Sequence, residues 1–137
     1  MFFPKSIIHL ILFLFIISGS LSLAEDYSDS DITKVVMLGS GNPFPDPERS
    51  GPSVAIIVND VPYLFDAGAG VWQATGAATP KYGGTVKALE SGNISKVFIT
   101  HLHSDHVVGL PSLILLPWAL GREAPLEVWG PPGTDNM

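Results

Sequence analysis

The feature that most constrains the fold is an apolar segment that runs directly into a cluster of metal-ligand side chains. Residues 96–100 read KVFIT, a pattern typical of a buried strand, and residues 101–106 read HLHSDH. Alternate residues of an extended chain point the same way, so His101 and His103 should present both imidazoles on one side. Asp105 and His106 follow where the chain turns toward a helix. The sequence therefore predicts a metal site at the end of this strand.

The composition narrows the chemistry of that site. The 137-residue chain has no cysteine and four histidines, so any metal must be held by imidazole and carboxylate groups. These are the ligands that Zn²⁺ takes when thiolates are absent. We expect two ions, one bound by His101 and His103 and the other by Asp105 and His106. Two such ions can share a water, lower its pKa to roughly 7 and stabilise the oxygens of a displacement.

The first 24 residues have the pattern of a signal peptide. Lys5 precedes an apolar run over residues 7–17, and Ser22 and Ala24 are small residues at the positions that a signal peptidase inspects. The run is shorter than the ~20 residues that span a bilayer. We therefore expect cleavage after residue 24 and a secreted or periplasmic domain over residues 25–137, with no membrane attachment. An uncleaved membrane anchor is the alternative.

The remainder reads as one mixed α/β domain. Strands are predicted over 33–38, 53–58, 61–65, 96–100 and 126–129, with a tight turn at Asn59 and Asp60. Residues 107–120 are predicted to be helical, bent or broken by two prolines, and residues 85–90 could form one or two helical turns. Four prolines make 42–52 an irregular loop. The last strand has no helix after it, so we expect an open sheet edge.

The net charge and the composition argue against two classes of protein, general nucleic-acid binders and disordered proteins. The chain carries 7 Lys and Arg against 13 Asp and Glu, a net charge of −6, which disfavours a general nucleic-acid binder. No stable nucleic-acid partner is expected. Hydrophobic residues make up 46% of the chain and charged residues 15%, which is not the composition of a disordered protein.

Several motifs together resemble one superfamily. HLHSDH is typical of the metallo-β-lactamase superfamily, and the segments VVMLGSGNP (35–43), RSGPS (49–53), LFDAG (64–68) and GPPGT (130–134) occur in the order seen there. Gly109-Leu110-Pro111 after the histidines is similar to the ribonuclease Z-like branch, which includes arylsulfatase-like members. The resemblance implies an α/β fold, the αββα sandwich, of which this chain covers the first half and is apparently truncated.

The resemblance also implies roles for particular residues. His101 and His103 would bind the first metal, Asp105 and His106 the second, and Asp105 would also activate or orient the hydrolytic water. Asp66 would support the metal-binding loop by accepting hydrogen bonds from ligand imidazoles or loop amides. A simple turn residue before glycine is the alternative for Asp66. The family's remaining ligands, two histidines and a bridging aspartate, lie further C-terminal, and nothing after His106 matches them.

Two hypotheses of function follow. The first is an exported metallohydrolase in which hydroxide held by two zinc ions attacks a phosphodiester or related ester, such as a sulfate ester. The substrate would then be a small molecule or phosphodiester, although not cytosolic tRNA, and a secreted β-lactamase or lactonase is the alternative enzyme. The second hypothesis is a non-catalytic fragment that binds metal weakly, turns over negligible substrate and covers its open edge as a homodimer.

Overall fold

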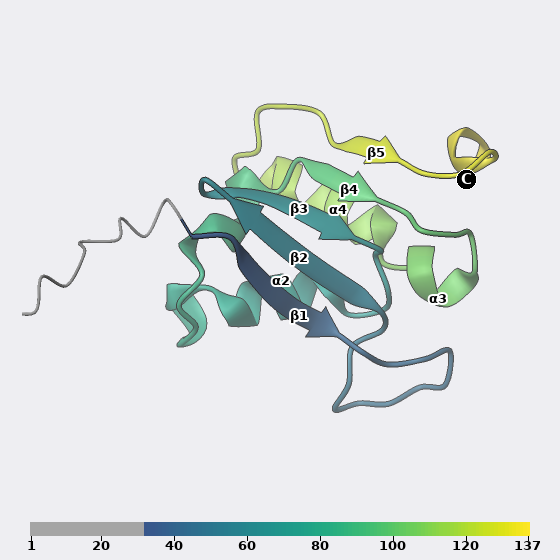
Figure 1. Cartoon of the computed structure of the whole chain (residues 1–137), viewed down its shortest axis with the longest axis horizontal. Coiled ribbons are helices and arrows are strands. Elements are labelled where there is room, and N and C mark those ends of the chain that lie inside the picture. The colour runs from purple at the N-terminus through teal and green to yellow at the C-terminus, as the bar shows by residue number, and fades with distance from the viewer. Residues whose placement is uncertain (1–31) are drawn as a thin grey trace, which may run out of the picture.

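The computed structural model describes residues 32–137, so the predicted signal peptide at 1–24 lies outside the described residues. A five-stranded sheet runs in the order β1 to β5 (Figure 1). Its strands are β1 (Lys34–Gly39), β2 (Ser53–Val58), β3 (Val61–Phe65), β4 (Lys96–Phe98) and β5 (Glu127–Trp129). The first three are antiparallel to one another, while β4 is parallel to β3 and β5 is parallel to β4. All five predicted strands are therefore confirmed, the last two slightly shorter than expected.

The hairpin between β2 and β3 follows from its two-residue turn. Asn59 and Asp60 both adopt positive φ angles, 49° and 60°, the conformation of a type I′ turn. Asparagine and aspartate tolerate this region better than other residues that carry a Cβ atom. The turn places Val58 opposite Val61 and sets the register of the whole pair.

The helices correct two details of the sequence interpretation. The helix expected over 107–120 is split into α3 (Ser104–Val107) and α4 (Leu110–Ala119), and α2 spans Val71–Ala78. The break falls at Val108 and Gly109, not at a proline. Pro111 lies in the first turn of α4, where a missing N–H costs nothing, and Pro117 is accommodated inside the helix. The expected helix over 85–90 is a single 3₁₀ turn, Lys87–Leu89, and further 3₁₀ turns span Pro80–Tyr82, Ser91–Asn93 and Thr134–Asn136.

One face of the sheet carries the core. Ala55, Ile57, Leu64 and Val97 point to the side where α2 and α4 lie, and all four are at most 2% exposed (Figure 1). Alternation along each strand explains this, because every second side chain falls on the same face. Within residues 32–137, the layers are thus one sheet and the helices on one side of it, which is the α/β half-sandwich that the sequence predicts.

The opposite face of the sheet is apolar and open. Val35 and Met37 on β1 are 66% and 64% exposed. Toward the other edge, the ring of Phe98 stacks on Phe65 and on Trp129, with centroid distances of 5.2 and 4.7 Å. No helix of the described part of the chain lies over these residues (Figure 1). The edge strand β5 pairs only with β4 within that part, as the sequence predicts.

A buried arginine closes the C-terminal end of α4. Arg122 is 5% exposed, and its guanidinium donates to the carbonyl oxygens of Leu113 at 2.7 Å, Ile114 at 2.9 Å and Ala124 at 3.0 Å. Pro117 has no N–H to donate to the carbonyl of Leu113 four residues earlier, so the guanidinium supplies the donor that this carbonyl lacks inside the helix. Burial lowers the pKa of Arg122 from its ordinary value. None of the helices in residues 32–137 has the length and apolar character needed to span a bilayer.

Candidate metal centre

The four predicted ligands gather beyond the end of β4, on the loop that leads into α3 and on α3 itself. The imidazole centroids of His101 and His103 lie 4.5 Å apart, and those of His101 and His106 lie 4.0 Å apart. His106 Nε2 is 3.7 Å from Asp105 Oδ2. Asp105 and His106 are on the short helix α3, which begins directly after His103. The structure therefore brings together all four residues that the sequence singles out.

The spacing of these donors suits pairs of ligands. Two donors that each lie about 2.1 Å from a tetrahedral zinc ion are about 3.4 Å apart, close to the observed Asp105–His106 separation. Among residues 32–137, no three His, Asp or Glu side chains are arranged to hold a single ion together. The residues present thus fit a divalent metal in donor type, and Asp105 with His106 also in spacing, with further ligands needed from elsewhere to complete each coordination sphere.

Asp66 connects the strand β3 to this cluster. It follows β3 directly, has φ 61°, and its side chain is only 10% exposed. Its carboxylate accepts hydrogen bonds from the Thr100 amide at 2.8 Å, from the Thr100 hydroxyl at 2.9 Å and from His106 Nδ1 at 2.8 Å. These are the two kinds of donor, a loop amide and a ligand imidazole, that the sequence analysis assigns to Asp66.

These hydrogen bonds fix which imidazole nitrogens remain available. A carboxylate has no proton to give, so His106 must donate from Nδ1, which leaves the Nε2 lone pair free for a metal. The Thr100 hydroxyl also donates to Asp66, so its oxygen accepts from His101 Nδ1 at 3.0 Å. His101 therefore also keeps an Nε2 lone pair. One buried carboxylate orients two of the three histidines, the second through a threonine.

Thr100 is the residue of this site that the sequence interpretation missed. It was placed at the end of a predicted strand, but the strand ends at Phe98. The Thr100 amide turns away from the sheet and donates to Asp66 instead. The available signal was a hydroxyl-bearing residue immediately before the first histidine, which by itself does not indicate a hydrogen-bonding partner 34 residues away.

Close backbone contacts hold the Asp66 turn against the histidine loop. The Ala67 amide donates to the His106 carbonyl at 2.7 Å, and the Gly109 amide donates to the Ala67 carbonyl at 2.8 Å. A Cβ atom on Gly68 would lie 2.8 Å from the Asp105 carbonyl oxygen and closer still to the backbone of Gly51. Glycine is required at position 68 for this approach, which explains the LFDAG motif in physical terms.

This geometry can be compared with known proteins. A family model described as the anti-Pycsar protein Apyc1 matches residues 33–122, more than half of the chain. The chain belongs to the Apyc1 family. The matched residues contain β1 to β4, the helices α2 to α4, Asp66, the four candidate ligands and Arg122. The strand β5 and the last 3₁₀ turn lie beyond them.

A comparison of the sequence with individual proteins finds similar ribonucleases Z. The chain is 36% identical over 104 residues to ribonuclease Z of Mycobacterium marinum. The aligned region covers 74% of this chain and 34% of that protein. The chain is also 36% identical over 107 residues to ribonuclease Z of Mycobacterium bovis, covering 76% and 35%. The chain thus spans about a third of the length of these relatives.

Two solved structures resemble the fold. The human short-form tRNase Z aligns with a TM-score of 0.61 at 33% identity, covering 74% of this chain and 35% of that one. The metallo-β-lactamase fold protein YhfI of Bacillus subtilis aligns with a TM-score of 0.60 at 21% identity, covering 77% and 39%, and shows the fold alone. The resemblance to the ribonuclease Z-like branch of the metallo-β-lactamase superfamily, and to its N-terminal part, is confirmed.

Proposed function

We propose that this chain is the metal-binding part of a hydrolase that uses two zinc ions to cleave a phosphodiester or related ester. The observation that carries the proposal is the gathering of three histidines and Asp105 on the loop after β4 and on α3, with two of the imidazoles oriented by Asp66. A site that only had to stabilise the fold would not need imidazole rings grouped in this way with ring nitrogens that no hydrogen bond of the described residues occupies.

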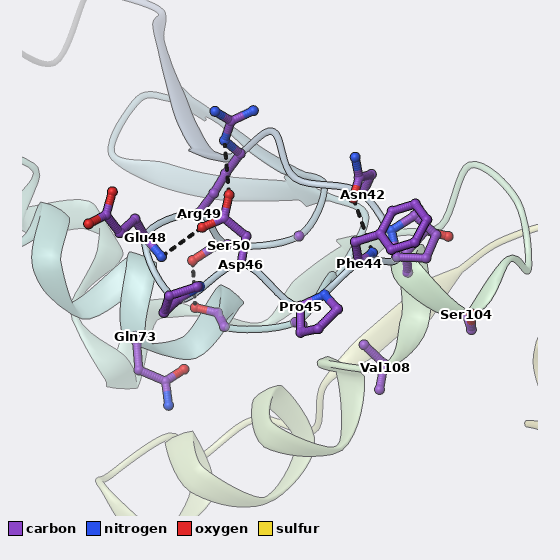
Figure 2. A pocket seen from close by; sticks show the side chains of 16 residues that line it. Asn42, Phe44, Pro45, Asp46, Glu48, Arg49, Ser50, Gln73, Ser104 and Val108 are labelled. Atoms are coloured by element: carbon purple, nitrogen blue, oxygen red, sulfur yellow. Dashed lines mark hydrogen bonds and ion pairs between the residues drawn. The ribbon is translucent and has the colours of Figure 1, made fainter.

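The roles of the residues follow from their contacts. His101 and His103 would hold one ion through imidazole nitrogens, and Asp105 with His106 would hold the other. Divalent ions in such a site act as Lewis acids and bring the pKa of water close to neutrality. Asp105 would orient that water, since it lies beside His106 and also lines the adjoining cavity, between the loop after β1 and the start of α3 (Figure 2). Asp66 would keep the proton of His106 on Nδ1, as second-sphere carboxylates do in other metal sites.

The names of the relatives support a nucleic-acid ester as the substrate. The similar proteins are ribonucleases Z and a tRNase Z, so the bond cleaved by those proteins is a phosphodiester. For an exported protein, cytosolic tRNA would be out of reach. We therefore propose an extracytoplasmic phosphodiester or a chemically similar ester.

Turnover by the 137-residue chain tests this function against the fragment hypothesis. The chain is loaded with zinc and assayed on a chromogenic phosphodiester, a chromogenic sulfate ester and a lactam, with and without a chelator. Chelator-sensitive hydrolysis of the phosphodiester is the expected result for the hydrolase. Weak zinc binding without any turnover would favour the non-catalytic fragment, and turnover of the lactam alone would contradict the proposed substrate class.

Export is a separate part of the proposal. Its support is the charged residue Lys5, the apolar run over residues 7–17 and the small residue Ala24. We expect the protein isolated from its source to begin at Glu25, which N-terminal sequencing reads directly. A native chain that still begins at Met1 would contradict cleavage and favour a membrane anchor.

A further inference from the structure

The RSGPS motif (49–53) lies against the LFDAG motif (64–68), which contains Asp66. The Gly68 amide donates to the Pro52 carbonyl at 3.0 Å, and the Gly51 amide donates to the Ala69 carbonyl at 2.7 Å. These bonds continue the pairing of β2 and β3 beyond the ends of the two strands. The two motifs therefore form one unit beneath the candidate metal centre.

This continued pairing contains one residue more on the β3 side. Val54 is paired with Phe65, and the next bond joins Pro52, two residues earlier, to Gly68, three residues later. Two residues opposite one is the pattern of a β-bulge, which bends a strand and re-aims a side chain. Asp66, with its positive φ, lies within the bulge. The side chain that is re-aimed is thus the carboxylate that orients two of the histidines.

Ser53 is the residue of β2 that faces this bulge. It is 2% exposed, and its hydroxyl donates to the Asp66 carbonyl at 2.9 Å. On the other side, the Asp66 amide donates to the carbonyl of Phe98 on β4 at 2.8 Å. The backbone of Asp66 is therefore held by both neighbouring strands. A left-handed conformation in a residue with a Cβ atom is unfavourable and persists only where its surroundings impose it.

We infer that Ser53 is a positioning residue of the candidate metal centre and acts on the histidines through Asp66. Its hydroxyl holds the Asp66 backbone in the conformation from which the carboxylate reaches His106 Nδ1 and the Thr100 hydroxyl. Ser53 itself supplies no metal ligand. The inference rests on the proposed function, because the orientation of the rings serves a reaction only where they bind metal.

Ser53→Ala removes only the hydroxyl and tests this role. The Asp66 carbonyl then loses a buried donor, and the carboxylate should be less well fixed against His106. Proton–nitrogen NMR spectra of the imidazoles, recorded on the metal-free full chain in mildly alkaline buffer, report which ring nitrogen carries the proton. We expect the His106 proton on Nδ1 in the wild type and a mixture of both tautomers in Ser53→Ala.

Zinc affinity is the second measurement, by competition of the full chain with a chromophoric chelator. It should fall about 2- to 10-fold in Ser53→Ala, the range that one neutral hydrogen bond is worth. Because Ser53 acts through the Asp66 carboxylate, the double variant Ser53→Ala/Asp66→Asn should bind zinc no more weakly than Asp66→Asn alone.

Thr75→Val is the matched control. Thr75 is 1% exposed, and its hydroxyl donates to the Trp72 carbonyl at 2.8 Å within α2. This variant also loses a buried hydroxyl bond, but away from Asp66. Urea unfolding should show a loss of stability in both variants, whereas the His106 tautomer and the zinc affinity should change only in Ser53→Ala.

The outcomes separate this inference from the proposed function. An unchanged tautomer in Ser53→Ala, an equal fall in zinc affinity in Thr75→Val, or additive losses in the double variant would overturn the inference, even if the chain hydrolyses an ester. A tautomer that depends on Ser53 in a chain that neither binds zinc nor hydrolyses an ester would support the positioning role and count against the hydrolase. The NMR signals of the folded chain are read directly, so partial unfolding of a variant does not imitate a change of tautomer.

Discussion

Asp66→Asn is expected to weaken zinc binding by about 10- to 100-fold while leaving the fold intact. The asparagine carbonyl can still accept from Thr100, and asparagine tolerates the positive φ of this position. Its NH₂ group, however, donates where the carboxylate accepted. His106 would then accept at Nδ1 and carry its proton on Nε2, the nitrogen needed for the metal. The ligand stays in place but in the wrong tautomer.

Competition of the full chain with a chromophoric zinc chelator measures this effect, and urea unfolding measures the stability of the same samples. Thr100→Val is a graded comparison, because it removes only the hydroxyl that connects Asp66 to His101 and leaves the bond to His106. Its zinc affinity should lie between those of the wild type and Asp66→Asn. Glu127→Gln, in the exposed ion pair with Lys96, is the remote control. An unchanged zinc affinity in Asp66→Asn would show that Asp66 is only a turn residue.

Replacing His101 and His103 together by alanine is expected to remove one of two zinc ions. His101 and His103 are the two residues proposed to bind the first ion. Loss of both should lower the affinity of that site for zinc by at least about 100-fold. Asp105 and His106 remain as the second pair, because His106 is still held by Asp66 through Nδ1 and Asp105 still lies 3.7 Å from His106 Nε2, although His106 loses its ring contact with His101. Native mass spectrometry of the full chain would count the ions that remain bound.

Leu102→Ala is the matched control for the double histidine variant. Leu102 lies between the two histidines, is 37% exposed and has no metal-binding atom, so zinc stoichiometry should not change. If the histidine variant still binds two ions with undiminished affinity, the assignment of His101 and His103 as ligands is wrong. If it loses both ions at once, the two sites are coupled and the division into pairs is wrong.

The elements that were predictable from sequence are those specified by local pattern. The alternation in 53–58 and 61–65 and the turn at Asn59 and Asp60 are contained within a short stretch of chain, so the hairpin could be derived directly. The donors of HLHSDH could be derived in the same way, because four ligand-type residues occupy six consecutive positions.

The features that were not predictable depend on contacts between distant segments. Thr100 leaves the sheet because Asp66, 34 positions earlier, accepts its amide and hydroxyl. The helix after the histidines breaks at Gly109 because its amide is bonded to Ala67, and not because a proline intervenes. The cavity beside Phe44 requires the loop after β1 to pack near α3, which no local pattern indicates.

The type I′ turn at the far end of the hairpin also determines the geometry of the candidate metal centre. It fixes the β2–β3 pairing over five residue pairs, and Asp66 comes immediately after the last of these in β3. Because side chains alternate with a period of two, an insertion or deletion of one residue in the turn would shift β3 along both neighbours and exchange its two faces. Leu64 would leave the core, and the Asp66 carboxylate would no longer lie opposite Thr100 and His106. The length of this turn therefore determines whether Asp66 can reach the candidate metal ligands, although no turn residue is near a histidine in the sequence.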